Sequence, residues 1–167
     1  MARKLLKIDS PDIFMINFAG RVTVNNPKGC RQFAWKIPTE ELADQLKEDG
    51  WAVWYTKDSE KYGPSAPAIT VEMKWHYEEN LKYLNPKIYK CTRRNPDGTL
   101  LTEDLIADLE NDEIEDITLW INPYHWTVNG KSGIKAYVDH MWVKVEDNDP
   151  TRRFWGLDEV EELPFEE

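Results

Sequence analysis

Apolar and polar residues alternate along several short stretches of this 167-residue chain, and this alternation predicts a mainly β structure. In the clearest run, residues 68–77, every second residue is apolar: Ile69, Val71, Met73, Trp75 and Tyr77. Similar alternation predicts strands over residues 12–25, 51–55, 87–94, 116–122 and 134–145. In the last of these, the apolar parity changes near Asp139 and His140, which predicts a β-bulge. The sequence Asn-Gly-Lys-Ser-Gly at residues 129–133 predicts a hairpin turn before this strand.

Two segments instead have the spacing of amphipathic helices. Thr39 is a capping residue for a helix over about residues 40–48, which ends at Gly50. Thr102 begins a second helix with one apolar face, formed by Leu105, Ile106 and Leu109.

The order of these elements predicts an OB-fold-like five-stranded barrel with a helix between strands 3 and 4. In this interpretation the helix over 40–48 and the short strand over 51–55 are additions, so the barrel has an extra helix in the first connection. Other small β-barrels and α+β folds have similar element orders, and the order alone leaves them open.

Negative charge is concentrated at the end of the chain. Residues 146–167 contain nine acidic residues against two arginines, so they carry −7 of the formal net charge of −10 and leave −3 on residues 1–145. Like-charged blocks stay solvated and often serve as interaction tails. We therefore expect a folded domain over residues 1–145 and an acidic, disordered tail over residues 146–167.

Basic and aromatic residues are interleaved in the body of the chain. Barrels that bind single strands use aromatic side chains to stack on bases and Lys or Arg to contact phosphates. Trp120 has the opposite parity from Leu119 and Ile121, so it is expected to face away from the core. The same residue types also serve as core packing and solvated surface, so which aromatics stack on bases stays open. The candidate DNA-binding residues are Arg31, Phe33, Trp35, Lys74, Tyr89, Arg93, Arg94, Trp120, Trp126, Lys131, Lys135 and Tyr137.

The acidic segment closes around a short apolar cluster. Its candidate partner-binding residues are Glu161, Glu162, Leu163, Pro164 and Phe165. This cluster resembles the acidic tip of bacterial single-stranded DNA-binding proteins, in which Pro-Phe ends the chain. Here Glu166 and Glu167 follow Phe165, so a contact with a terminal Phe carboxylate does not carry over directly.

A longer stretch, residues 116–126 followed by 130–138, resembles bacteriophage-encoded single-stranded DNA-binding proteins. The resemblance implies sequence-tolerant binding of single-stranded DNA in phage replication or recombination. It also implies that the tail recruits replication or recombination proteins. A flexible polyanion would in addition compete with DNA for a basic groove, and the alternative is that the tail only keeps the chain soluble.

Two other classes of function were weighed against DNA binding. The first is an acidic inhibitor or DNA mimic that binds a host protein, which would spread negative charge over the folded surface. The second is a metal-dependent nuclease, because Glu72 and Lys74 form half of such a site if Asp12 or Asp58 completes it. The nuclease spacing is not persuasive, so we expect no enzymatic activity, no cofactor and no metal site.

The remaining expectations concern location and assembly. No apolar run reaches the length of a membrane span, and the N-terminal apolar stretch is too short for a signal peptide. We therefore expect a cytoplasmic protein, in the host cell if the chain is phage-encoded. Cys30 and Cys91 are expected to be separate thiols. The sequence leaves open whether the chain forms a homodimer.

Overall fold

The protein is described here by a computed structural model that covers residues 5–24, 26–60 and 63–146. The predicted tail over 146–167 lies outside these residues except for Glu146, so the domain boundary stays a prediction. The elements, in chain order, are β1 (Leu6–Asp9), β2 (Asp12–Asn17), β3 (Arg31–Lys36), α1 (Glu40–Asp49), β4 (Trp54–Tyr55), β5 (Pro67–Met73), the 3-10 helix η1 (Glu79–Leu84), β6 (Lys87–Cys91), β7 (Thr99–Leu101), α2 (Glu103–Ile106), the 3-10 helix η2 (Ala107–Asn111), β8 (Ile114–Val128) and β9 (Lys131–Val145).

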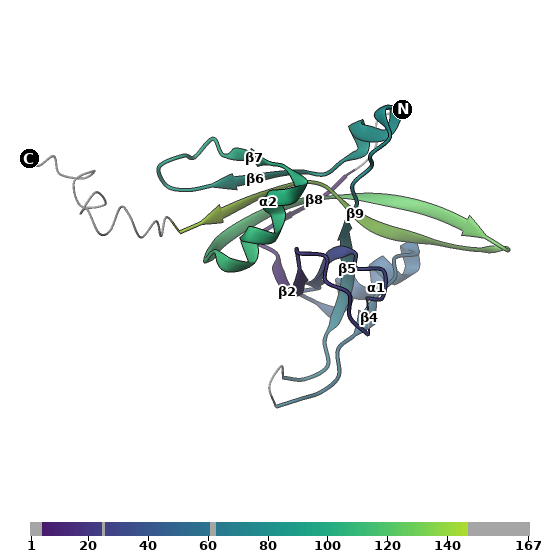
Figure 1. Ribbon diagram of the computed structural model, residues 1–167. Coiled ribbons are helices and arrows are strands. Elements are labelled where there is room, and N and C mark those ends of the chain that lie inside the picture. Colours follow the sequence, from purple (N-terminus) through teal and green to yellow (C-terminus); the bar gives the residue numbers. More distant parts are fainter. Residues whose placement is uncertain (1–4, 25, 61–62, 147–167) are drawn as a thin grey trace, which may run out of the picture.

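All nine strands in the described part of the chain belong to one sheet, and few residues are helical (Figure 1). The main path of the sheet has the order β1-β8-β9-β5-β3-β2, while β4 pairs with β5 and the β6–β7 hairpin joins through β9. Most neighbours are antiparallel, but β9 runs parallel to β5 and to β6. The prediction of a mainly β fold is confirmed.

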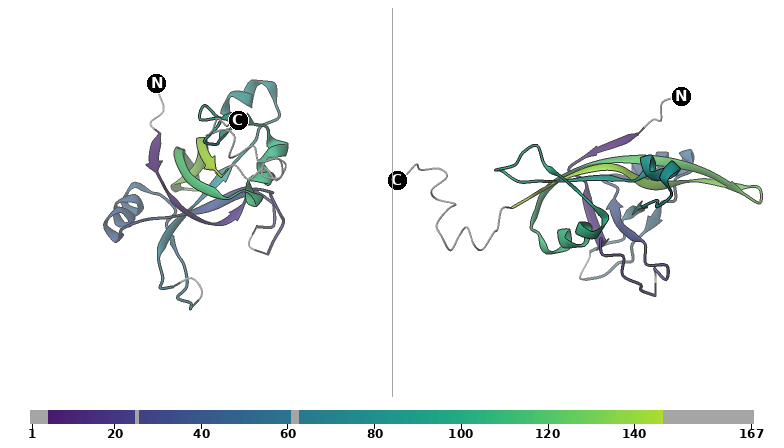
Figure 2. Two further views of the ribbon diagram at one scale, coloured as in Figure 1. Left: turned by 90° about the vertical axis from the view of Figure 1, so that its left-hand side faces the viewer. Right: turned by 45° about the horizontal axis from the view of Figure 1, so that its top comes forward.

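The two end strands of this path, β1 and β2, are consecutive in the chain. Ser10 lies between them with a φ of 51°, and its N–H donates to the Ile117 carbonyl at 2.8 Å. One bent segment therefore pairs with β8 through its first half and with β3 through its second half. This arrangement curls the sheet into the partly open barrel of an OB-type fold (Figure 2).

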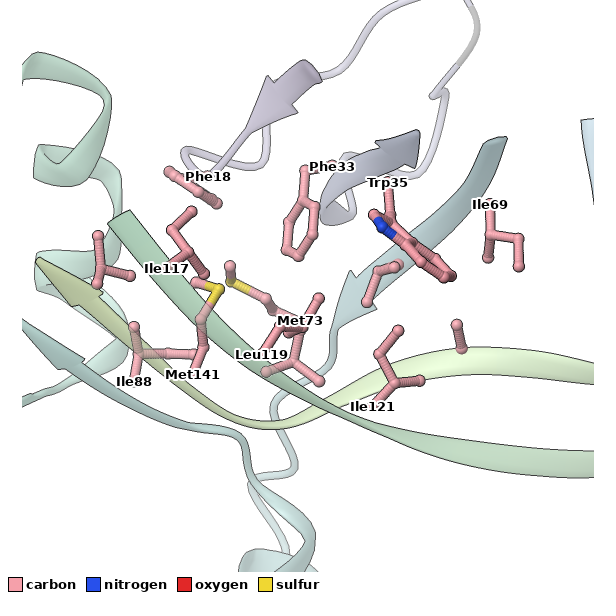
Figure 3. Packing of buried hydrophobic residues seen from close by; sticks show 14 of the residues in the cluster. Phe18, Phe33, Trp35, Ile69, Met73, Ile88, Ile117, Leu119, Ile121 and Met141 are labelled. Atoms are coloured by element: carbon pink, nitrogen blue, oxygen red, sulfur yellow. The ribbon is translucent and has the colours of Figure 1, made fainter. Parts of the chain in front are cut away.

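The concave side of the sheet holds the hydrophobic core (Figure 3). Phe18 and Phe33 meet edge to face with ring centroids 6.0 Å apart. Alternate residues of β8 and β9 complete the core, among them Leu119 and Met141, which are fully buried. Because side chains alternate along a strand, the residues between them face outward.

Helix α1 has the predicted ends. The Leu42 N–H donates to Thr39 Oγ1 at 3.1 Å, and Gly50 closes the helix in the left-handed conformation with a φ of 104°. The second predicted helix also lies before β8, where α2 continues into η2. The helix predicted over residues 40–48 is confirmed. The second helix lies where it was predicted, but the Thr102 side chain makes no capping hydrogen bond, and Leu105 is 43% exposed whereas Ile106 and Leu109 are buried.

The predicted place of α1 in the barrel is wrong. Residues 31–36 form β3, which pairs with β2 on one side and with β5 on the other, so α1 lies in the connection after the second barrel segment. The strand expected over 87–94 is present as β6, which ends at Cys91. It pairs with β7 in a hairpin and with β9, so it is an addition that extends the sheet beside β9 rather than a strand of the barrel.

Two strand predictions also change in length. Strand β2 ends at Asn17, because the Asn17 side chain accepts from the Arg21 N–H at 2.9 Å and donates to the Arg21 carbonyl at 3.0 Å, which closes a turn. Val22 and Val24 are exposed beyond that turn despite their matching parity. In contrast, β8 continues through Pro123. Its pairing with β1 extends only as far as Ile121, opposite Leu6, so within the described residues no β1 strand requires an N–H from Pro123.

The predicted bulge and hairpin turn are confirmed. His140 pairs with Trp120 and Val138 pairs with Ile121, which leaves Asp139 as the extra residue. Asn129 and Gly130 have φ values of 51° and 79°, as a two-residue hairpin turn requires.

Cys30 and Cys91 are free thiols, as predicted, and burial raises the pKa of both. Among the described helices, none has the length and apolar character needed to cross a membrane.

Candidate nucleic-acid interface

The outer side of β6, β8 and β9 carries a continuous row of aromatic side chains. Trp120 lies between the buried residues Leu119 and Ile121, and Trp142 lies between Met141 and Val143, so both indoles face outward. Strand pairing places the other members on the same side. We call this set the aromatic face, and it consists of Tyr89, Trp120, Tyr124, Trp126, Tyr137, His140 and Trp142.

Most members of the aromatic face contact one another in pairs. Tyr89 stacks on Trp142 with ring centroids 4.5 Å apart, and Trp120 stacks on His140 at 4.2 Å. Tyr124 meets Tyr137 edge to face at 6.0 Å. The face therefore offers several ring surfaces along one ribbon, which continues toward the hairpin tip seen at the right of Figure 1.

Trp126 is the member closest to the hairpin tip, opposite Gly133. A Cβ atom on Gly133 would lie 2.8 Å from Trp126 Cζ2, so the indole lies directly on the glycine backbone. Only glycine leaves this close approach open. The packing holds the ring against the ribbon, and Trp126 remains half-buried rather than part of the core.

Lysines accompany the aromatic rings. Lys7 Nζ lies 5.4 Å from the Trp120 ring centroid, and Lys135 Nζ lies 5.2 Å from that of Tyr137. Partial burial opposes the charge on Lys135, but its hydrogen bond to Glu72 outweighs this and raises the pKa of the ammonium. The Lys135–Glu72 ion pair measures 2.8 Å, with the carboxylate largely buried. Lys87 and Lys131 have the same outward parity.

A pocket of ≈ 290 Å³ opens beside the middle of the aromatic face. Tyr124 and Tyr137 line one part of it, and Lys74, His76 and Leu84 contribute from the chain between β5 and β6. The His76 N–H donates to Asn85 Oδ1 at 2.6 Å, which ties the beginning of that connection to its end. Lys74 thus lies next to the aromatic face, as does Lys135.

The structure brings seven of the predicted residues to this region: Lys74, Tyr89, Trp120, Trp126, Lys131, Lys135 and Tyr137. Arg93 and Arg94 lie at the same end of the ribbon as Tyr89, in the turn between β6 and β7. Gly98 of that turn packs against the Tyr89–Trp142 pair.

Phe33 and Trp35 require a correction. Only 1% and 3% of their surfaces are exposed, and both belong to the core, so neither ring is available to stack on a base. Arg31 of the same strand has structural partners: it donates to the Phe18 carbonyl at 2.7 Å, and its Nε lies 3.5 Å from Glu103 Oε2. The basic-aromatic segment 31–36 is therefore mainly a barrel strand.

Sequence reasoning missed Trp142, His140 and Lys7 as site residues. The signal for Trp142 and His140 was present, because both have the opposite parity from Met141 and Val143. Lys7 had no such signal, since its place depends on the pairing of β1 with β8. A separate outward pair, Phe14 and Trp54, lies over β2, β4 and β5, with ring centroids 6.1 Å apart.

The residues considered for a nuclease site have other neighbours. Glu72 pairs with Lys135, Asp12 lies opposite Lys36, and Asp58 accepts a hydrogen bond from the Ser65 N–H. Within residues 5–24, 26–60 and 63–146, no three His, Cys, Asp or Glu side chains are grouped in a way that could hold a metal ion.

Barrels that bind single strands combine outward aromatic rings with nearby basic side chains, and this curled sheet carries both. A protein-family model described as "Putative phage ssDNA-binding domain" matches residues 2–165, nearly the whole chain. The chain therefore belongs to this family, and its class of function is the binding of single-stranded DNA.

Solved structures similar to this chain come from phages. The C-terminally truncated single-stranded DNA-binding protein from bacteriophage Enc34 has a TM-score of 0.48 and 11% identity, covering 85% of this chain and 84% of that chain. For the untruncated Enc34 protein the TM-score is 0.46 and the identity is 10%. The match covers 89% of this chain and 88% of the Enc34 protein. For gp2.5, a single-stranded DNA-binding protein encoded by bacteriophage T7, the TM-score is 0.43 and the identity is 10%. That match covers 96% of this chain and 97% of gp2.5. Comparison with curated protein sequences finds no match.

Proposed function

We propose that the aromatic face is the surface on which this chain holds single-stranded DNA, without strong dependence on sequence, during phage replication or recombination. The observation that carries the proposal is the row of outward stacks along β6, β8 and β9. Every base has a π-face, so stacking on such rings tolerates any sequence. The protein would act by binding, without catalysis, in the cytoplasm of the host cell.

Phosphates of the bound strand would be contacted by the lysines beside the rings. Lys7 and Lys135 lie within cation–π distance of Trp120 and Tyr137, so each cation is next to a stacking surface. Lys74, Lys131, Arg93 and Arg94 would extend the contacts in both directions along the ribbon. Release of counterions from the DNA makes such binding salt-dependent.

The acidic tail would regulate this surface and recruit partners. Residues 146–167 carry most of the net negative charge, and β9, which supplies Tyr137, His140 and Trp142, leads directly into them. A tethered polyanion competes with DNA most strongly at low salt. Once DNA displaces the tail, its Leu163–Phe165 cluster would be available to replication or recombination proteins.

Fluorescence anisotropy of labelled oligo-dT at two salt concentrations tests the proposal. The full chain is compared with residues 1–146, which keep the hydrogen bond from the Glu146 N–H to the Glu113 carbonyl. We expect salt-weakened binding by both proteins, and tighter binding by the shorter one at low salt. Equal affinities at low salt would leave the tail with a solubilising role, and the absence of binding by both would refute the proposal.

A further inference from the structure

The pocket beside the aromatic face is built differently from the open ribbon around it. The bulge at Asp139 interrupts the regular pairing of β8 and β9 at this point, and Asp139 itself lines the pocket. Bulges commonly re-aim side chains next to functional sites. Leu84, the last residue of η1, also lines the pocket, and η1 is drawn in teal above the ribbon in Figure 1. The lining therefore combines residues of β8 and β9 with residues of the chain between β5 and β6.

The size and walls of the pocket suit one planar ring. Small-molecule sites usually measure about 300–1,000 Å³, and this pocket of ≈ 290 Å³ is at the lower end of that range. Tyr124 and Tyr137 meet at an interplanar angle of 72°, so a ring that stacks on one tyrosine has its edge directed along the other. A base that leaves the stacked strand could therefore be held by its face and read at its edge.

Polar groups with unused hydrogen-bonding capacity line the same pocket. Asn122 lies opposite Tyr137 in the strand pairing, and its side-chain amide has no hydrogen-bond partner among the described residues. The Lys74 ammonium, also in the pocket lining, likewise has no ion pair within the described part of the chain. The amide offers two N–H donors and a carbonyl acceptor, whereas the ammonium offers only donors.

This combination favours bases that carry a carbonyl oxygen at C4 of a pyrimidine or C6 of a purine. Thymine and guanine each present a ring N–H beside a carbonyl, which a side-chain amide can match with two hydrogen bonds. A lysine requires an acceptor, and the carbonyl oxygen supplies one, whereas cytosine and adenine place an amino group at the corresponding position. Lys74 is therefore the group that would distinguish the two kinds of base.

We propose that this pocket takes a single unstacked nucleobase and prefers keto bases, thymine or guanine, through Lys74 and Asn122. The proposal rests on the proposed function, because the base belongs to the strand held on the aromatic face. The pocket would then select the base at one position, while the rest of the aromatic face tolerates any sequence.

The test compares two oligonucleotides of equal length, oligo-dT and oligo-5-methyl-dC, titrated into the full-length protein at pH 8. The two bases share their shape and methyl group and differ in the edge that Lys74 and Asn122 would read. Because a good pair of base contacts discriminates by about 1–3 kcal/mol, we expect oligo-dT to bind about tenfold more tightly. Lys74→Met keeps the length of the side chain and should bring the ratio of affinities close to 1. Asn122→Leu removes an amide that can pair with either base edge, so it should weaken binding of both oligonucleotides and keep the preference for oligo-dT.

Lys131→Met is the matched control, because it removes a cation from the ribbon outside the pocket. It should weaken binding of both oligonucleotides equally and preserve their ratio. Equal affinities in the unaltered protein would overturn the pocket proposal while leaving DNA binding intact. A ratio that persists in Lys74→Met would equally overturn it, and failure of both oligonucleotides to bind would refute the proposed function as well. Circular dichroism of each variant checks that it is folded.

Discussion

Two segments of this chain, residues 31–36 and 120–137, have the same mixture of aromatic and basic residues but lie in opposite environments. In β3, Phe33 and Trp35 face the core, where they pair with Val71 and Ile69 across the sheet. In the β8–β9 hairpin the aromatic residues are the outward ones. Composition therefore indicates that a segment contains residues of the types that stack on bases. Whether their side chains face the core or the outside, and so can reach a base, depends on their position in the strand alternation.

The largest expected effect is on the free energy of unfolding, which a substitution in β3 should lower much more than one in the β8–β9 hairpin. Trp35→Ala should lower the free energy of unfolding by about 3–5 kcal/mol, because it leaves a large cavity in the core. Urea denaturation followed by circular dichroism measures the change. Trp126→Ala is the matched variant on the ribbon, and a comparable loss of stability there would contradict the assignment of Trp126 to an outward surface.

The second expected effect is on DNA affinity, which substitutions in the β8–β9 hairpin should weaken. Trp126→Ala or Tyr137→Ala should weaken oligo-dT binding by about 1–3 kcal/mol if each ring stacks on a base. Anisotropy titrations at fixed salt measure the change. An unchanged affinity in a variant that still unfolds cooperatively would remove that residue from the interface.

A third, smaller effect concerns the chain that leads into β3. Glu110 of η2 accepts from the Ala19 N–H at 2.8 Å and from Arg21 Nη1 at 2.6 Å. Glu110→Gln should lower the free energy of unfolding by about 1 kcal/mol at neutral pH and leave DNA affinity unchanged. Thermal denaturation measures the first effect, and oligo-dT titration checks the second.

The same residue gives a pH dependence. Burial opposes the charge of Glu110, but the bonds from Arg21 and the Ala19 N–H outweigh it and lower the pKa from the usual value of 4.5. A lowered pKa in the folded state means that the stabilisation is present above pH 4.5 and is lost as the pH falls through the folded-state value. The melting temperatures of Glu110→Gln and the unaltered protein should therefore converge in acid. A difference that stays constant down to pH 3 would contradict this account.

The smallest expected effect concerns the carboxylate beside the aromatic face. Glu72→Gln should tighten oligo-dT binding by about 0.2–1 kcal/mol at low salt, because it removes a negative charge that competes with phosphate for Lys135. Asp44→Asn, which removes a carboxylate near Lys47 on α1, is the control and should change nothing. Weaker binding by Glu72→Gln would show that the ion pair positions Lys135 for DNA rather than competing with it.

Local signals predicted much of the fold. The cap at Thr39, the stop at Gly50, the Asn129-Gly130 turn and the bulge at Asp139 depend on neighbouring residues, and each was predicted correctly. The place of β3 in the barrel was not predicted, because pairing with β2 and β5 joins residues far apart in the sequence. The matching parity of Val22 and Val24 predicted a strand that continues to residue 25, but the Asn17–Arg21 turn ends that strand before them.

The site was predictable to the same extent. Trp120 followed from its parity, and Trp142 and His140 could have been found in the same way. Lys7 and the pocket depend on tertiary contacts, with β1 for Lys7 and with η1 for the pocket, and no local pattern indicates them. The tail residues Glu161–Phe165 lie outside the described part of the chain, so their role stays a prediction.

The central claim is that single-stranded DNA lies on the outer side of the β8–β9 ribbon. Photocrosslinking of an oligo-dT containing 5-iododeoxyuridine, followed by mass spectrometry of the linked peptides, tests it most directly. We predict crosslinks to Trp120, Tyr124, Trp126, Tyr137 or Trp142. Crosslinks confined to Phe14 and Trp54, the other outward aromatic pair, would place the DNA on a different face of the barrel and contradict the claim.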